Sequence, residues 1–322
     1  MPYRLCRQAC THRTGHTERA CQSWLFPTLL NNPLMTKMVD TLLAARWLIP
    51  VQPERVVLNN HALALAGGRI VDILPTAAAT ERYAGVPLEE FPAHAITPGF
   101  INTHTHAAMS LLRGIADDLP LMTWLSEHIW PLEKRWVNEA FVGDGTELAM
   151  AEMIRGGVTC FNDMYFFPAM TAHKAAAAGL RSVIGMIVLD FPSNFAEGAK
   201  DYLQRAMSLH EMFQGHPLVR TAFAPHAPYT VSDEPLLEIG QKAAEWGCRV
   251  HIHVHETRDE IARAVSETGV RPLARLDRLG LVNTSLLAVH MTQLTEAEIM
   301  RLAAAGSHVV HCPESNLKLA SG

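Results

Sequence analysis

Strand-like apolar stretches alternate with helical stretches from about residue 96 onward, and this alternation constrains the fold of the 322-residue chain more than any other feature. Counting the run that ends at His106, we predict seven strands, the others being Val158–Asp163, Arg181–Asp190, Val219–His226, Arg249–His255, Ser285–His290 and His308–Cys312. The predicted helices, several of which end in Gly as helix C-termini often do, are Phe141–Gly156, Pro168–Gly179, Tyr202–Phe213, Glu234–Gly247, Arg258–Gly269 and Thr295–Gly306. Alternating strands and helices predict an α/β fold with a parallel sheet, most simply a (β/α)₈ barrel whose eighth strand is missing.

The first 95 residues follow other patterns. Residues 38–95 are expected to form the N-terminal part of a small β-sandwich domain, with strands at Thr41–Leu48, Val56–Ala66 and Arg69–Leu74 and a hairpin turn at Gly67-Gly68. Residues 1–37 show no sustained periodicity and are expected to be a disordered extension. A small zinc site is the alternative for this segment, although the spacings fit no finger pattern, and its residues would be Cys6, Cys10, His12, His16 and Cys21. Residues 96–322 then make up the incomplete barrel.

Bulk properties limit the partners. The net charge is −5 and no long run of one sign occurs, which argues against nucleic acid as a partner. No apolar stretch approaches the roughly 18 residues that span a bilayer, so no membrane association is expected. The six cysteines, without a signal peptide, predict reduced thiols and a cytoplasmic location. A homo-oligomer is left open.

Polar side chains stand at the C-terminal ends of the predicted strands. In a parallel barrel this rim holds the active site, and the residues there are His104, His106, Asp163, His226, His290 and His311. His104 and His106 are two positions apart on one strand, so both face the same side and could hold one metal ion between them.

The fifth predicted strand carries three histidines. His251, His253 and His255 share one face by parity, so periodicity alone leaves open which of them binds metal. Glu256 has the opposite parity. It can join the site only if the strand ends near His255 and the chain bends inward.

Several strings point to a known family. From about residue 38 the chain resembles the 5-methylthioadenosine/S-adenosylhomocysteine deaminases of the amidohydrolase superfamily. The strings that carry the resemblance are Pro98–His106, Trp130–Glu133, Gly156–Tyr165, Ala224–Tyr229, His253–Glu256 and His311–Leu319. The first and last are shared with related deaminases and triazine hydrolases. Asn162–Tyr165 and Trp130–Glu133 point more narrowly to the nucleoside enzymes.

The resemblance implies a role for each site residue. His104, His106 and His253 would be ligands of one divalent metal, with Zn²⁺ favoured and Fe²⁺ left open. Glu256 would be the proton shuttle, in contact with the substrate, and His290 would orient the metal-bound hydroxide. Glu133 would bind the ribose hydroxyls and His226 would help to hold the nucleoside. The implied reaction is hydrolytic deamination of 5′-methylthioadenosine, S-adenosylhomocysteine or both, giving the inosine analogue and ammonia.

Three residues that occur in some or all relatives are absent from this chain. The stretch Ile184–Asp190 has no Arg where some members contact substrate, which leaves the outer substrate contacts open. No Lys lies near the end of the fourth strand, so a mononuclear site is favoured. The family's fourth ligand is an Asp on the eighth strand, which the sequence does not reach, and by motif neither Asp163 nor Asp190 replaces it.

Two alternatives are kept. The chain could instead be another aminohydrolase of the superfamily, acting on guanine, cytosine or a triazine, or it could be an inactive fragment. We expect the 322-residue chain to be inactive or nearly so and an extended version to be active. Measurable deamination by the 322-residue chain would overturn that expectation.

Overall fold

A computed structural model describes residues 38–321, which form two compact units that divide between Pro98 and Gly99. The N-terminal segment in which a zinc site was considered lies outside the described residues. The five metal-binding and catalytic candidates, and the substrate-binding candidates, all belong to the second unit.

The first unit contains one mixed four-stranded sheet in the order β3-β2-β1-β4. Its strands are β1 (Thr41–Leu48), β2 (Leu58–Ala66), β3 (Arg69–Pro75) and β4 (Leu88–Ile96), and one helix, α1 (Thr76–Arg82), accompanies them. The predicted hairpin is confirmed, because β2 and β3 pair antiparallel across Gly67 and Gly68, whose φ angles are both positive, as a two-residue hairpin turn requires. The strand β4, which was not separately predicted, pairs parallel with β1.

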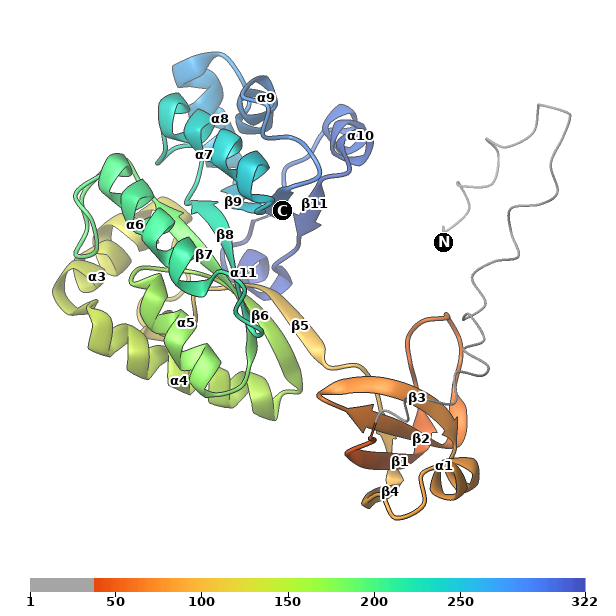
Figure 1. The fold of residues 1–322 in the computed structure, drawn as a ribbon. Helices are drawn as coiled ribbons and strands as arrows, with labels where there is room; N and C mark the ends of the chain where they lie inside the picture. The colour runs from red at the N-terminus through yellow and green to blue at the C-terminus, as the bar shows by residue number, and fades with distance from the viewer. Residues whose placement is uncertain (1–37, 322) are drawn as a thin grey trace, which may run out of the picture. The chain divides into compact units, whose positions relative to one another are not determined.

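The second unit is built on seven parallel strands that neighbour one another in chain order, from β5 to β11, and form a nearly closed barrel (Figure 1). The strands are β5 (Phe100–Thr105), β6 (Val158–Met164), β7 (Arg181–Val188), β8 (Val219–Pro225), β9 (Val250–Val254), β10 (Leu286–His290) and β11 (His308–Val310). All seven predicted strands are confirmed, although most end one or two residues earlier than the apolar pattern suggested. The parallel α/β barrel inferred from the alternation, with seven of its eight strands, is therefore confirmed.

Helices cover the outside of this sheet (Figure 1). They are α4 (Glu139–Arg155), α5 (Pro168–Ala177), α6 (Ala199–Phe213), α7 (Asp233–Trp246), α8 (Arg258–Thr268), α9 (Pro272–Arg278) and α10 (Glu296–Ala305). A further helix, α11 (Pro313–Lys318), follows β11 and lies beside the end of β10, where Asn316 contacts His290. The six predicted helices are confirmed, and α7, α8 and α10 end at left-handed glycines, Gly247, Gly269 and Gly306. The short helices α9 and α11 were not predicted.

Residues 107–136 form a helical segment that periodicity did not predict. It consists of a 3₁₀ helix (Ala107–Leu112), α2 (Leu121–Thr123), a π-helical stretch (Trp124–Ile129) and α3 (Trp130–Trp136). Gly145 on α4 lets this helix lie directly against the backbone of Ala108, where any larger side chain would collide. The segment is thereby fixed beside the end of β5, next to His106.

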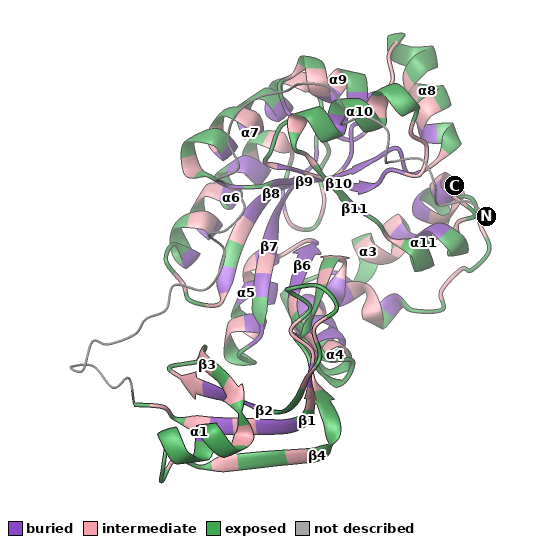
Figure 2. Cartoon of the chain, turned by 90° about the vertical axis from the view of Figure 1, so that its right-hand side faces the viewer, coloured by how far each residue is buried: buried purple, intermediate pink, exposed green. Residues whose placement is uncertain are grey.

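The core lies between the strands and the covering helices. β8 and β9 are buried along most of their length (Figure 2), and Ile184, Phe223 and Ile252 are fully excluded from solvent. Burial of such side chains contributes about 1.5–3 kcal/mol each. The strands are thus rigid supports for the polar residues at their ends. Among residues 38–321, none of the helices combines the length and apolar character needed to cross a lipid bilayer.

Candidate active site

Histidines from three strands meet at the C-terminal end of the barrel. His104 on β5, His253 on β9 and His290 at the end of β10 place one ring nitrogen each within 4.8 Å of one another. His253 and His290 are buried and their rings stack with centroids 5.4 Å apart. The strand ends therefore converge as the sequence predicts.

The predicted pair at the end of β5 stays together. The rings of His104 and His106 lie edge to face with centroids 4.7 Å apart, and the His106 ring lies 5.3 Å from that of His253. His106 follows the last strand residue with a φ of −119°, so the chain leaves the strand without a left-handed residue. His106 is thus beside the three-histidine group rather than in its most compact part.

The three histidines of β9 separate into two groups. Nε2 of His253 lies 3.1 Å from Nε2 of His104, and Nε2 of His251 lies 3.0 Å from Nδ1 of the same ring. His255 instead turns away, and its Nε2 accepts the backbone N–H of Leu273 at 3.1 Å. The three histidines of equal parity therefore take different places, with His253 central to the group, His251 behind His104, and His255 outside it.

The nitrogen arrangement fits a divalent metal ion. His253 donates from Nδ1 to the carbonyl of His226 at 2.8 Å, and His106 donates from Nδ1 to the carbonyl of Met164 at 2.5 Å. A carbonyl can only accept, so both rings present a bare Nε2 lone pair to the site. The lone pair on Nε2 of His253 faces Nε2 of His104 at 3.1 Å. Two ring nitrogens this close together can both coordinate one bound cation, which would stabilise the arrangement.

Glu256 enters the site through a sharp bend. His255 has a φ of +53°, a left-handed conformation that is uncommon for a residue with a side chain. The bend reverses the strand parity and places Oε1 of Glu256 3.4 Å from Nε2 of His290. The condition that the sequence sets for Glu256 is therefore met.

Burial dominates the electrostatics of this pair. It raises the pKa of Glu256 to about 8, with a further contribution from the nearby Glu260 carboxylate. Burial, together with the neighbouring His106, lowers the pKa of His290 to about 4. Near neutral pH the imidazole of His290 therefore stays neutral, while the carboxyl of Glu256 exchanges a proton close to the pH range in which general acid–base chemistry operates.

A cavity of about 460 Å³ adjoins the histidines. Its polar lining includes His106, His226 and Glu133, and much of the rest of its wall is apolar. Burial raises the pKa of Glu133 to about 7, while a hydrogen bond from Tyr165 opposes the rise. The Tyr165 hydroxyl donates to Oε1 of Glu133 at 2.8 Å, so this carboxyl is held at the wall of the cavity.

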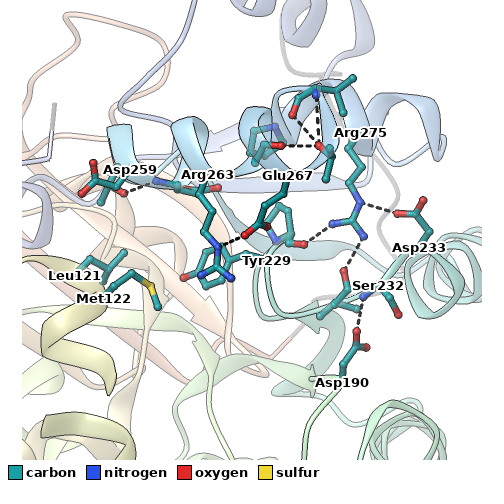
Figure 3. Close-up of a pocket in the computed structure, with 18 of the residues that line it drawn as sticks. Leu121, Met122, Asp190, Tyr229, Ser232, Asp233, Asp259, Arg263, Glu267 and Arg275 are labelled. Atoms are coloured by element: carbon teal, nitrogen blue, oxygen red, sulfur yellow. Dashed lines mark hydrogen bonds and ion pairs between the residues drawn. The ribbon is translucent and has the colours of Figure 1, made fainter. Parts of the chain in front are cut away.

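Two aspartates hold loops rather than joining the histidines. Oδ1 of Asp163 accepts the hydroxyl of Thr105 at 2.8 Å and the backbone N–H of Ala107 at 2.7 Å, which ties β6 to the end of β5. Asp190 accepts the backbone N–H of Ser232 at 2.8 Å beside a second, more polar cavity of about 570 Å³ (Figure 3). At the wall of this cavity, Nε of Arg275 donates to Oδ1 of Asp233 at 2.6 Å and so ties α9 to the start of α7, after the loop that follows β8.

Sequence reasoning missed three supporting residues. They are Tyr165 on Glu133, Asn316, whose amide nitrogen lies 3.2 Å from Nδ1 of His290, and Glu260 behind Glu256. Tyr165 and Asn316 lie within strings that carry the family resemblance, which was the available signal. Nothing local distinguishes Glu260 from other helix-start acids. His311, which was grouped with the strand-end residues, is exposed.

The model of the amidohydrolase family matches residues 95–322. The chain belongs to the amidohydrolase family. The family resemblance inferred from the strand-end strings is thereby confirmed, and the amidohydrolase match covers the whole of the seven-stranded barrel.

Similar amidohydrolases extend beyond the matched length. A 5-methylthioadenosine/S-adenosylhomocysteine deaminase of Saccharophagus degradans is 48% identical over 88% of this chain and 64% of its own length. A protein of the same name from Teredinibacter turnerae is 46% identical over 89% of this chain and 65% of its own. The crystal structure of an adenosine deaminase from Xanthomonas campestris with bound zinc has a TM-score of 0.87 at 52% identity, covering 88% of this chain and 65% of that one. The chain thus spans about two thirds or slightly less of the length of these relatives.

Proposed function

We propose that the protein is a metal-dependent deaminase of adenine nucleosides. It would convert 5′-methylthioadenosine, S-adenosylhomocysteine or both into the inosine analogue and ammonia. The observation that carries this proposal is the buried Glu256–His290 pair beside the facing nitrogens of His104 and His253. The names of the relatives at 46–48% identity and of the zinc-containing deaminase structure support the choice of substrate class.

We assign the metal to His104, His106 and His253, with Zn²⁺ as the favoured ion. Two of these rings are oriented by Nδ1–H bonds to carbonyls, an arrangement that fixes the tautomer of a metal-binding imidazole. When bound, such an ion supplies Lewis acidity and lowers the pKa of a water molecule to about 7. The neutral histidines that burial favours here are the form that binds a cation.

The proton transfers are assigned to Glu256. Its carboxylate would take a proton from the attacking water and pass it to N1 of the adenine ring, after which it would assist the departure of ammonia from C6. A pKa of about 8 lets this group both accept and return a proton near neutral pH. His290, 3.4 Å from Glu256, would hold the attacking oxygen by a hydrogen bond.

The nucleoside would occupy the 460 Å³ cavity. Glu133 in its ionised form would accept hydrogen bonds from the ribose hydroxyls, and His226 would contact the nucleoside near the metal end. The apolar part of the lining suits the adenine ring and an apolar 5′ substituent. The partner is thus a small-molecule nucleoside.

The direct test is ammonia release from four candidates: 5′-methylthioadenosine, S-adenosylhomocysteine, guanine and cytosine. The assay is run on the 322-residue chain and on the product of any reading frame that continues past it, each after loading with Zn²⁺. We expect the extended product to turn over one or both nucleosides and neither guanine nor cytosine, and the 322-residue chain to show little or no turnover. Ammonia from guanine or cytosine alone would contradict the nucleoside assignment.

A further inference from the structure

The turns after β9 and β10 both pass through left-handed backbone at residues other than glycine. His255 has a φ of +53°, and His290 and Met291 have φ values of +74° and +53°. Such conformations persist only where surrounding contacts enforce them, and they gather at functional sites. These two turns carry Glu256 and His290, so the contacts that enforce them also place the proposed proton-transfer pair.

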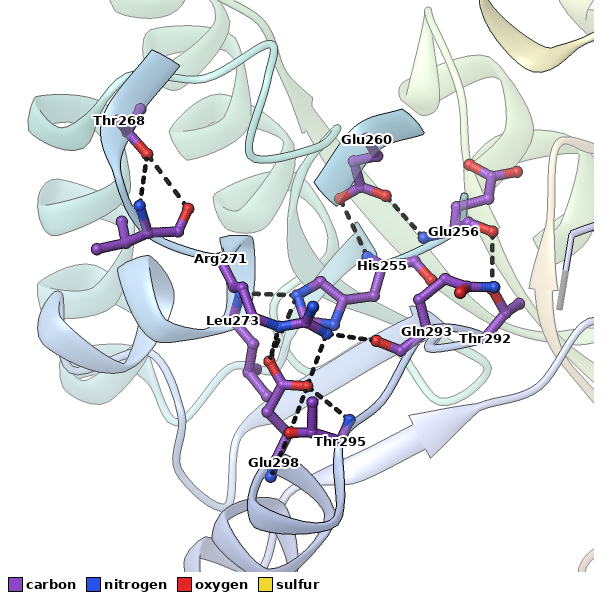
Figure 4. A network of polar contacts seen from close by, with 11 residues as sticks. His255, Glu256, Glu260, Thr268, Arg271, Leu273, Thr292, Gln293, Thr295 and Glu298 are labelled. Atoms are coloured by element: carbon purple, nitrogen blue, oxygen red, sulfur yellow. Dashed lines mark hydrogen bonds and ion pairs between the residues drawn. The ribbon is translucent and has the colours of Figure 1, made fainter. Parts of the chain in front are cut away.

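Glu260 enforces the first turn. Its buried carboxylate accepts the backbone N–H of His255 at 3.0 Å on one oxygen and that of Glu256 at 2.7 Å on the other (Figure 4). The backbone of Glu260 is fixed in the first turn of α8, where the hydroxyl of the N-cap residue Thr257 accepts the N–H of Glu260 at 3.1 Å. Two consecutive buried amides thus depend on one side chain, and both would lose their partner if the turn opened.

Thr292 joins this turn to the second one. Its backbone N–H donates to the carbonyl of His255 at 3.0 Å, and its hydroxyl lies 2.9 Å from the carbonyl of Glu256 (Figure 4). The N–H of Met291 donates to the carbonyl of Val254 at 3.1 Å. The backbone that carries Glu256 is therefore bonded directly to the backbone that follows His290.

We propose that Glu260 and Thr292 are positioning residues that hold the two left-handed turns and thereby set the separation of Glu256 from His290. Without them the chain after β9 relaxes toward regular strand geometry. In a regular strand His255 faces inward and Glu256 faces outward, so the relaxed turn withdraws the proton-transfer carboxyl from the site. The inference rests on the proposed function, because Glu256 is a proton shuttle only if the protein is a deaminase.

The two residues act through Glu256 rather than on the substrate. Neither of them lines the 460 Å³ cavity in which the nucleoside is placed, and neither contacts the three proposed metal ligands. Their loss should therefore lower kcat while KM and the metal content stay unchanged. A residue that merely stabilised the fold would not produce that division.

The test uses two matched pairs of variants. Glu260→Gln keeps the shape but sets an amide NH₂ against a backbone N–H, and Glu267→Gln, an exposed position on the same helix, is its control. Thr292→Val keeps the shape without the hydroxyl, and Thr292→Ser restores the hydroxyl. We expect Glu260→Gln and Thr292→Val to lower kcat about 10²-fold, the cost of a misplacement of about 1 Å, while Thr292→Ser and Glu267→Gln stay close to wild type.

Hydrogen exchange at the amides of His255 and Glu256, resolved by mass spectrometry, is measured alongside and needs no substrate. We expect these amides to be protected in the wild type and in Glu267→Gln but not in Glu260→Gln. Unchanged protection together with unchanged kcat in both test variants would overturn the proposal, as would loss of metal in step with kcat. If neither the 322-residue chain nor an extended product deaminates a nucleoside, the proposed function fails, and the exchange measurement still decides whether Glu260 holds the turn. If Glu260→Gln does not fold, the Thr292 pair decides.

Discussion

The ends of β5 and β9 offer an instructive contrast. Each strand carries histidines two residues apart, yet β5 keeps His104 and His106 together, whereas β9 keeps His253 and sends His255 away. The difference lies in one backbone angle, since φ is −119° at His106 and +53° at His255. Parity therefore predicts a site only as far as the strand conformation extends.

Each strand end is also held by a buried carboxylate from a neighbouring element. Asp163 accepts the N–H of Ala107, directly after His106, and Glu260 accepts the N–H groups of His255 and Glu256. The first carboxylate supports two histidines that continue the strand pattern. The second supports a turn that directs Glu256 into the site in place of His255. In the proposed function, the same device thus supports the metal-binding end of one strand and the proton-transfer end of the other.

The largest effect is expected from replacing each of two histidines at the end of β9, His253 and His255, by alanine and comparing the results. His253→Ala should lose the metal, and deamination should fall by more than about 10⁴-fold because the water returns to its bulk pKa. His255→Ala should keep the metal and most of the activity, although the Leu273 N–H loses its partner at a cost of about 1–3 kcal/mol in unfolding free energy. Elemental analysis and a denaturant titration check both. Metal loss in folded His255→Ala would remove the contrast between the two positions.

The fold was largely predictable because its elements are long or strongly patterned. The seven strands and six of the helices follow from apolar runs and helix-terminal glycines. The helix α9 was not predicted because its seven residues are too few to show a clear helical periodicity. The stretch Trp124–Ile129 was not predicted because π-helical hydrogen bonding has no characteristic sequence pattern.

The site was predictable only in part. His104 and His106 follow from spacing, since both lie at the end of a regular strand. The choice among His251, His253 and His255 did not follow from spacing, because the bend at His255 depends on Glu260 and Thr292, which come from α8 and from the turn after β10. Tertiary contacts of this kind leave no local signal in the sequence.

The second-largest effect is expected at the residue that the bend delivers. Glu256→Gln should retain the metal while kcat falls by about 10²- to 10⁴-fold, because the amide cannot carry the proton from water to the adenine ring. Glu267→Gln is the matched control on an exposed part of α8. Metal content and kcat are measured on the same samples. Loss of metal in Glu256→Gln would instead make Glu256 a ligand, and the two strand ends would then serve one purpose.

Asp163 should affect the metal where Glu260 does not. Asp163→Ala leaves the N–H of Ala107 and the hydroxyl of Thr105 without their acceptor, so the end of β5 loosens and metal affinity should fall by about 10- to 100-fold. Asp163→Asn keeps one acceptor oxygen and should retain most of the affinity. Competition with a chelator measures both. Equal metal affinity in wild type and Asp163→Ala would show that β5 holds its histidines without this support.

The smallest effect is expected at Tyr165, which lies two residues after Asp163 and whose hydroxyl donates to Glu133 and does not support the proposed metal ligands. Burial raises the pKa of Glu133 to about 7 and the Tyr165 hydrogen bond opposes that rise, so Tyr165→Phe should raise the pKa further. Only the ionised carboxylate accepts hydrogen bonds from two ribose hydroxyls, so KM should fall as pH rises through about 7 in the wild type. In Tyr165→Phe that fall in KM should move to higher pH. Near neutral pH, KM should rise about fivefold, which corresponds to the loss of one hydrogen bond, and kcat should change little.

Tyr83→Phe, which removes a hydroxyl bonded to Asp72 in the first unit, controls for loss of a phenol hydroxyl. If the pH dependence of KM were the same in Tyr165→Phe as in the wild type, Glu133 would not be the group that binds the ribose. The polar residues at the end of β6 would then serve only to support β5, through Asp163.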